Sequence, residues 1–211
     1  MLIFMEGLVW LVLAFAPLFI LGFYVGRSSP RLLFFGGIGW ILALILRIIP
    51  LNLFQMLVPD LTAIIIYSAV MAGLFEEGMR FWLVKRTKAL DFKAGLTFGL
   101  GWGIAEALVV FFPNVLLSPK ALNLGLFDLL PGIFERYVAV LAHVALTFII
   151  IKAISYREYL FVAIVAHAVL DLIAGLTYYV MRLSVWQVEG LVAAYTLLLS
   201  IYAFYVIKKV Y

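Results

Sequence analysis

The chain of 211 residues contains no cysteine and only two histidines. Without cysteine it cannot form a disulfide, a thiolate metal site or a cysteine nucleophile. Charged residues are also scarce, at 12% of the chain, whereas soluble domains contain about a quarter. The net charge of +4 is small, and it lies mostly in short loops, which suits anionic lipid headgroups better than nucleic acid. We therefore expect a lipid bilayer as a partner and no nucleic acid.

Apolar residues make up 67% of the chain, and the mean hydropathy is +1.21. Apolar runs recur along the full length, which predicts an all-α, multi-pass membrane protein with a single transmembrane domain, residues 1–211. Seven spans are predicted, at roughly 6–25, 33–50, 61–84, 94–113, 132–153, 159–181 and 187–207. The second is expected to end at Arg47 and Pro50, in the connector IIPLN. The first has no basic residues before it and no small-residue cleavage site, so we expect a retained helix.

The basic residues predict an orientation. If the loop after the first span is cytoplasmic, that side holds ten of them: Arg27, Arg31, Lys85, Arg86, Lys88, Lys93, Lys152, Arg157, Lys208 and Lys209. The other side holds three: Arg47, Lys120 and Arg182. This positive-inside bias places the N-terminus outside and the C-terminus in the cytoplasm of a cell membrane.

Nine ionisable residues fall inside the third to sixth spans: Glu76, Glu77, Arg80, Glu106, Glu135, Arg136, His143, His167 and Asp171. Each costs about 2.5–3.5 kcal/mol on insertion scales. They are therefore expected to face one another or a hydrated cavity, in a polar core at about residues 75–172.

Helical spacing suggests how they pair. Arg80 lies four residues after Glu76 and three after Glu77, so it can pair with either carboxylate and leave the other to act as a base. The plainer alternative is a salt bridge that only neutralises charge. His167 and Asp171 are also four residues apart and can hydrogen-bond.

The sixth span carries a second polar face, because His143 lies seven residues after Arg136, with Glu135 beside that face. Phe98, Trp102 and Glu106 form another stripe within FGLGWGIAEA. The glycines in and just before this segment are expected to let another helix approach closely. These are Gly95, Gly99, Gly101 and Gly103.

The stretches EEGMR, FGLGWGIAEAL, FERYVAVLAHVALT and HAVLDL, in that order, resemble YhfC-type intramembrane proteases of the type II CAAX prenyl endopeptidase superfamily. FAPLFILGFYVG, GLGWGIAEALVVFFPN and the two spaced histidines are also similar to the APH subunit of gamma-secretase, a seven-helix protein with its N-terminus outside.

The resemblance implies catalytic roles for Glu76, Glu77, Arg80, His143, His167 and Asp171. One glutamate would activate water while Arg80 holds the pair. His167 would polarise the scissile carbonyl or bind a metal; with His143 it could form a zinc site. Trp102 stands where enzymes of the superfamily have a histidine. Trp102, Glu106, Glu135 and Arg136 are expected in supporting roles.

Three functions remain open from the sequence. The first is an intramembrane endopeptidase that uses a glutamate-activated water, with a membrane protein or peptide as substrate. The second is a non-catalytic scaffold that binds another membrane protein through the same cavity, which Trp102 favours. The third is a small ion or proton transporter, although no inverted repeat supports it.

Overall fold

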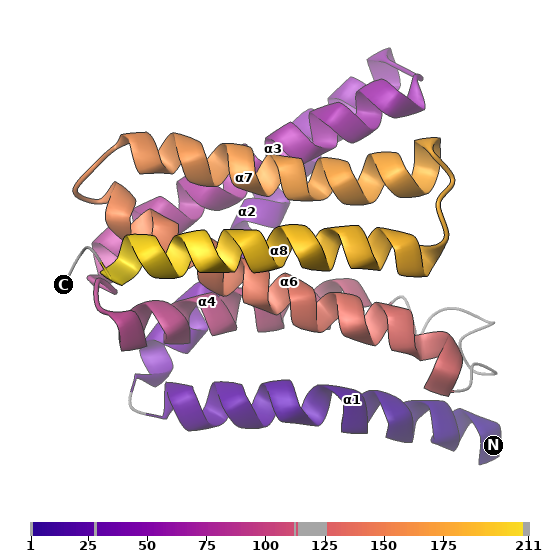
Figure 1. The fold of residues 1–211 in the computed structure, drawn as a ribbon, viewed down its shortest axis with the longest axis horizontal. Helices are drawn as coiled ribbons and strands as arrows, with labels where there is room; N and C mark the ends of the chain where they lie inside the picture. The colour runs from indigo at the N-terminus through magenta and orange to yellow at the C-terminus, as the bar shows by residue number, and fades with distance from the viewer. Residues whose placement is uncertain (1, 28, 112, 114–125, 209–211) are drawn as a thin grey trace.

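The computed structural model describes residues 2–27, 29–111, 113 and 126–208, and this part of the chain is helical without any strand. The helices are α1 (Leu2–Gly26), α2 (Pro30–Leu57), α3 (Leu61–Thr87), α4 (Phe92–Glu106), α6 (Leu126–Ala153), α7 (Glu158–Gly175) and α8 (Val185–Lys208). A π-helical segment extends α4 as η1 (Ala107–Phe111) and another extends α7 as η3 (Leu176–Val180). The helices run roughly along one direction, and the α2–α3 hairpin projects from the bundle at the upper right (Figure 1).

Six helices of the described chain are long and apolar enough to cross a membrane: Pro30–Leu57, Leu61–Thr87, Phe92–Phe111, Leu129–Ala153, Glu158–Val180 and Val185–Lys208. They correspond to the second to seventh predicted spans. The first predicted span falls on α1, whose apolar stretch Phe15–Gly26 is shorter than the 18 residues that such a helix needs. The chain is thus a multi-pass membrane protein, and the count of seven spans stays a prediction.

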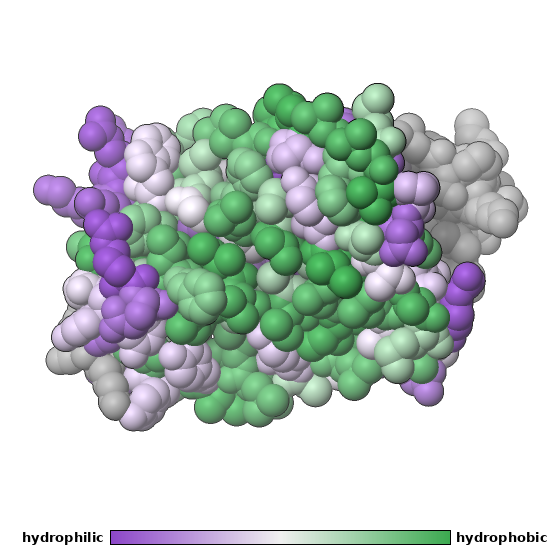
Figure 2. Space-filling model, turned by 90° about the horizontal axis from the view of Figure 1, so that it is seen from above, coloured by the Kyte–Doolittle hydropathy of each residue, from purple (hydrophilic) through white to green (hydrophobic). Residues whose placement is uncertain are grey.

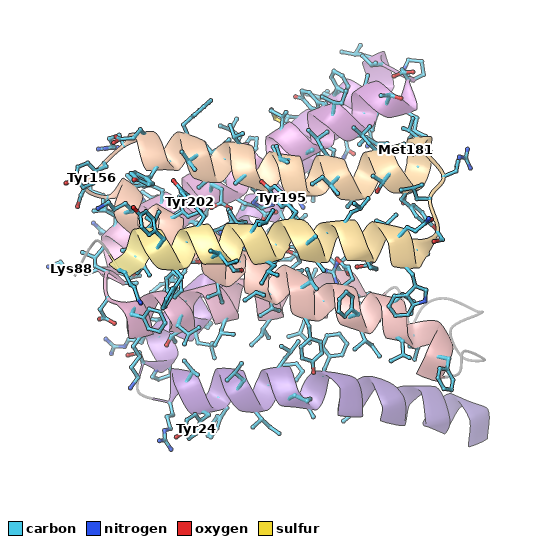
Figure 3. The ribbon with its side chains drawn as sticks, viewed as in Figure 1. Tyr24, Lys88, Tyr156, Met181, Tyr195 and Tyr202 are labelled. Carbon is cyan, nitrogen blue, oxygen red and sulfur yellow. The ribbon has the colours of Figure 1, made fainter. Side chains whose placement is uncertain are left out.

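The molecular surface agrees with a bilayer location. Apolar side chains cover the middle of the face seen in Figure 2, while hydrophilic side chains gather toward its two ends. Lys88 and Tyr156 lie at one end of the bundle and Met181 at the other (Figure 3). Which end faces the cytoplasm stays a prediction, and Lys120 and Lys209 lie outside the described residues.

The predicted end of the second span is wrong. Helix α2 continues through Pro50 to Leu57, so IIPLN is not a connector. A proline removes one backbone donor and crowds the carbonyl four residues earlier, which bends a helix more often than it ends one in a membrane. The true break follows at Val58–Asp60, where the Asp60 side chain accepts a hydrogen bond from Ala63 N at 2.7 Å and caps α3.

The glycines of α4 pack this helix tightly between two others, as predicted. A Cβ atom on Gly101 would lie 2.1 Å from the Leu33 carbonyl oxygen of α2. On the other side, a Cβ atom on Gly99 would lie 2.8 Å from Val144 Cα of α6. Only glycine allows both backbones to come so near. This packing holds α4 in the centre of the molecule and brings α2 and α6 to the same polar core.

Helices α3 and α7 meet in a similar way. A Cβ atom on Gly73 would lie 2.5 Å from the Ile164 carbonyl oxygen. Glu77 lies one turn after Gly73, and His167 precedes Ala168, whose backbone nitrogen lies 3.3 Å from the same Cβ position. Because α3 and α7 run in opposite directions and side chains lean toward the N-terminus of their helix, the Glu77 and His167 side chains lean toward each other.

Candidate functional site

Five helices contribute polar side chains to one cavity of about 220 Å³. Its ionisable lining comes from α2, α3, α4, α6 and α7: Arg47, Glu76, Glu106, Glu135, His143, His167 and Asp171. Apolar residues such as Leu170 and Val192 complete the wall. The ionisable residues that a bilayer would reject are thus concentrated in one place.

Glu76 faces this cavity with both carboxylate oxygens engaged. Oε1 accepts a hydrogen bond from Arg47 Nη1 at 2.8 Å, and Oε2 accepts one from Trp102 Nε1 at 3.1 Å. His167 Nε2 lies 3.9 Å from Oε2. A guanidinium and an indole N–H both stabilise the ionised carboxylate.

Glu77 has different surroundings, although it is the next residue. It is fully buried and is absent from the described residues that line the cavity. Its carboxylate accepts hydrogen bonds from Arg80 Nη1 at 3.0 Å and from His167 Nδ1 at 2.7 Å. Glu77 therefore holds two other site residues in position.

Arg80 connects Glu77 to His143. Its Nη2 lies 2.8 Å from His143 Nδ1. A guanidinium carries only donors, so Nδ1 must accept and the His143 proton lies on Nε2. That nitrogen donates to Glu106 Oε2. Arg80 is fully buried, and its Cζ lies 4.4 Å from the centre of the Trp102 ring, in cation–π contact.

Glu106 continues the network on the other side of the cavity. Its Oε1 accepts a hydrogen bond from Arg136 Nη1 at 3.1 Å. The Nε and Nη2 atoms of Arg136 both donate to Glu135. The pair of Glu135 and Arg136 therefore neutralises charge within α6 and also links that helix to α4.

Asp171 lies at the edge of the cavity, with its side chain 40% exposed. The hydrogen bond expected between His167 and Asp171 does not form, because their nearest charged atoms are 3.9 Å apart. His167 Nδ1 bonds across the helix interface to Glu77 instead.

Residues 12–116 match the family model described as YhfC intramembrane metalloprotease. The match covers just under half of the chain and includes Glu76, Glu77, Trp102 and Glu106, whereas His143 and His167 lie beyond it. No curated protein and no solved structure matches the chain. The similarity to the CAAX endopeptidases and to the APH subunit stays a prediction.

The YhfC description implies a metal ion, and the cavity offers suitable donors. One ligand atom each from Glu76, Glu106 and His143 lies within 4.8 Å of the others. Carboxylate and imidazole are ordinary zinc ligands. Within the network described above, five carboxylates face three guanidinium groups. The resulting excess of two negative charges equals the charge of one divalent cation.

The two histidines fit a metal differently. His167 donates its Nδ1 proton to Glu77, which leaves Nε2 facing Glu76 in the pattern usual for a metal-binding histidine. His143 receives the Arg80 guanidinium at Nδ1, where such histidines usually have an acceptor. That both histidines bind a metal therefore stays a prediction. The carboxylates of Glu76 and Glu106 are additional candidate ligands.

The structure brings together the residues that the sequence selected. Trp102, expected in the histidine slot, is fully buried beneath the cavity and is not among the described lining residues. Arg47 was placed in an outer loop, but it lies in α2 and pairs with Glu76. A basic residue inside an apolar helix could have indicated a site residue. Because the helix was expected to end at Pro50, Arg47 was counted as a loop residue instead.

Proposed function

We propose that the chain is an intramembrane metalloprotease that hydrolyses peptide bonds with a water activated at Glu76. The observation that carries this proposal is the cavity in which Glu76, Glu106, His143 and His167 face one another. The match to the YhfC family model over residues 12–116 supports it independently.

Glu106, His167 and, once its Nε2 proton is released, His143 are the residues that would hold the metal, with Glu76 beside them as the base. When bound, a zinc ion would act as a Lewis acid toward the carbonyl and the water. Glu77 would orient His167 from behind, as carboxylates do for many metal-binding histidines. Arg80 in turn would supply the counter-charge for Glu77 in its buried position.

Glu76 is the better candidate for the general base, because it lines the cavity while Glu77 does not. A carboxylate must reach the proton it accepts, directly or through one water. Arg47 and Trp102 fix the Glu76 carboxylate in place. With the water proton on Glu76, the remaining hydroxide would attack the peptide carbonyl.

Two N–H groups are suited to receive the negative charge that then develops on the carbonyl oxygen. Trp40 and Arg47 both line the cavity. Trp40 Nε1 and Arg47 Nε are buried, and neither has an acceptor among the described residues. Preorganised donors of this kind stabilise an oxyanion in a water-poor site.

The proposal is tested by incubating the purified protein in lipid nanodiscs with a peptide library and identifying the products by mass spectrometry. We expect cleavage that a chelator removes and that added zinc restores. Glu76→Gln should lower the rate by about 10²–10⁴-fold, the usual effect of a general base. Glu158→Gln is the matched control, because Glu158 is exposed at the far end of α7.

The scaffold function remains the alternative and predicts another outcome. It requires no cleavage under any metal condition, and a membrane protein that copurifies with the chain but is lost on changing His143 or His167. Cleavage that persists in Glu76→Gln would instead overturn the assignment of Glu76 as the base.

A further inference from the structure

A second and larger cavity, of about 860 Å³, adjoins the first. Its lining comes from the end of α2, the first half of α3, the end of α7, η3 and the start of α8, with one residue each from η1 and α6. Four residues line both cavities: Val110, Glu135, Asp171 and Ala174. The larger cavity therefore leads to the site from the end of the bundle that carries Met181 (Figure 3).

The lining of this larger cavity combines apolar and acidic side chains. Leu61, Ile64, Ile65, Val185 and Val188 supply much of its apolar surface. Its charged residues are three acids, Glu135, Asp171 and Glu189, and no basic residue occurs among the described lining residues. The surface suits an apolar segment that carries a positive charge.

Glu189 is the unexplained member of this set. It lies near the start of α8 and is 8% exposed. Its Oε2 is buried and has no hydrogen-bond partner among the described residues. An unpaired buried polar atom is costly and rare in a native protein. Glu189 had no role in the sequence analysis, because a single acid near a helix end resembles an ordinary interface residue.

Arg136 does not supply the missing hydrogen bond of Glu189. Arg136 acts on it electrostatically, but none of the hydrogen bonds that its guanidinium makes goes to Glu189. Nε and Nη2 donate to Glu135, and Nη1 donates to Glu106. The carboxylate at position 189 is therefore available to a donor that comes from outside the chain.

We propose that Glu189 binds a cationic group of the substrate, an ammonium or guanidinium on an otherwise apolar peptide segment. The proposal rests on the proposed function, since the larger cavity is then the route by which the segment reaches Glu76. A cation brings both the missing hydrogen-bond donor and the missing charge, and such charge-assisted bonds are strong where water is scarce.

The test measures peptide binding, not cleavage. Pairs of apolar peptides that differ only by one lysine or one norleucine are titrated against the full chain in nanodiscs, with the position of the lysine scanned along the peptide. N-acetylated and free-amine forms of each pair distinguish a lysine side chain from an α-amino group. For the best position we expect the cationic peptide to bind about ten- to a hundredfold more tightly.

Variants assign that preference to one carboxylate. Glu189→Gln should remove it while leaving the affinity for the uncharged peptide unchanged, which also shows that the variant is folded. Glu189→Asp, which keeps the charge, should retain a weaker preference. Glu158→Gln, the same charge change at the far end of the bundle, should behave as the unmodified chain does.

Equal binding of both members of every pair overturns the proposal, as does a preference that survives in Glu189→Gln. Because binding is measured without cleavage, the two hypotheses fail separately. A chain that cleaves nothing but keeps a Glu189-dependent preference contradicts the protease function alone. Cleavage without such a preference contradicts the role of Glu189 alone.

Discussion

Two adjacent glutamates on a helix face different surroundings, because successive side chains point about 100° apart around the helix axis. In EEGMR this geometry separates Glu76, which lines the cavity, from Glu77, which is buried against Arg80 and His167. The sequence predicted that one of the pair would act on water and the other would pair with Arg80. It could not decide which, since both lie within reach of Arg80 along the helix.

Exchanging these two carboxylates for amides should therefore have different effects on stability. Glu77→Gln leaves the fully buried Arg80 without its counter-charge, a change that costs about 3–5 kcal/mol. Glu76→Gln leaves Arg47, whose side chain is 18% exposed and can be solvated from the cavity. We expect thermal unfolding in detergent to show a much larger fall in Tm for Glu77→Gln. Equal falls in Tm would contradict the division of roles.

Trp102 offers a second test on a single group. Trp102→Phe keeps an aromatic ring beneath Arg80 but removes the N–H that bonds to Glu76. Hydrogen bonds to charged groups contribute about 1.5–3 kcal/mol, so both Tm and the cleavage rate should fall. Trp82→Phe is the matched control, because Trp82 is exposed on α3. A loss of equal size in Trp82→Phe would show that the effect is not specific to the site.

Between helices, backbone proximity decides which side chains meet. The glycines of α4 signalled close packing in the sequence, but periodicity within one helix cannot name the helix that packs against it. The same limit explains why the hydrogen-bond partner of His167 was predicted wrongly. The expected partner, Asp171, lies one turn away on α7. The approach of α3 at Gly73 supplies Glu77, and the contact between helices forms instead of the contact within one.

Alanine substitutions at two glycines of α3 distinguish the effect of helix packing on stability from the effect of helix propensity. Gly73→Ala would place a methyl group 2.5 Å from the Ile164 carbonyl oxygen and should push α7 away, lowering both Tm and the cleavage rate. Gly78→Ala meets nothing within 4 Å and should raise stability by up to about 1 kcal/mol through helix propensity. The two variants are compared by thermal unfolding and by the peptide cleavage assay. A neutral Gly73→Ala would mean that α3 and α7 do not rely on this contact to hold Glu77 and His167 together.

Across the whole molecule, hydropathy predicted seven spans, and six of them are described helices long and apolar enough to cross a bilayer, because burial in lipid imposes both length and composition. Helix ends were harder to predict. The apparent break at Pro50 misplaced Arg47, and so one cation of the site was counted as a loop residue. A proline in a lipid-facing helix has a different meaning from a proline in a soluble protein, and composition alone does not show where such a helix stops.

The orientation of the chain in the membrane can be measured by cysteine labelling, because the sequence contains no cysteine of its own. Single cysteines can be introduced at Tyr156 and Met181, which are exposed at opposite ends of the bundle (Figure 3). The excess of basic residues at the Tyr156 end predicts that this end is cytoplasmic. In intact cells, a membrane-impermeant maleimide should then label Met181→Cys but not Tyr156→Cys, and permeabilised cells should show both. The reverse pattern would overturn the predicted topology and would move the opening of the larger cavity, and with it the side from which a substrate enters, to the cytoplasm.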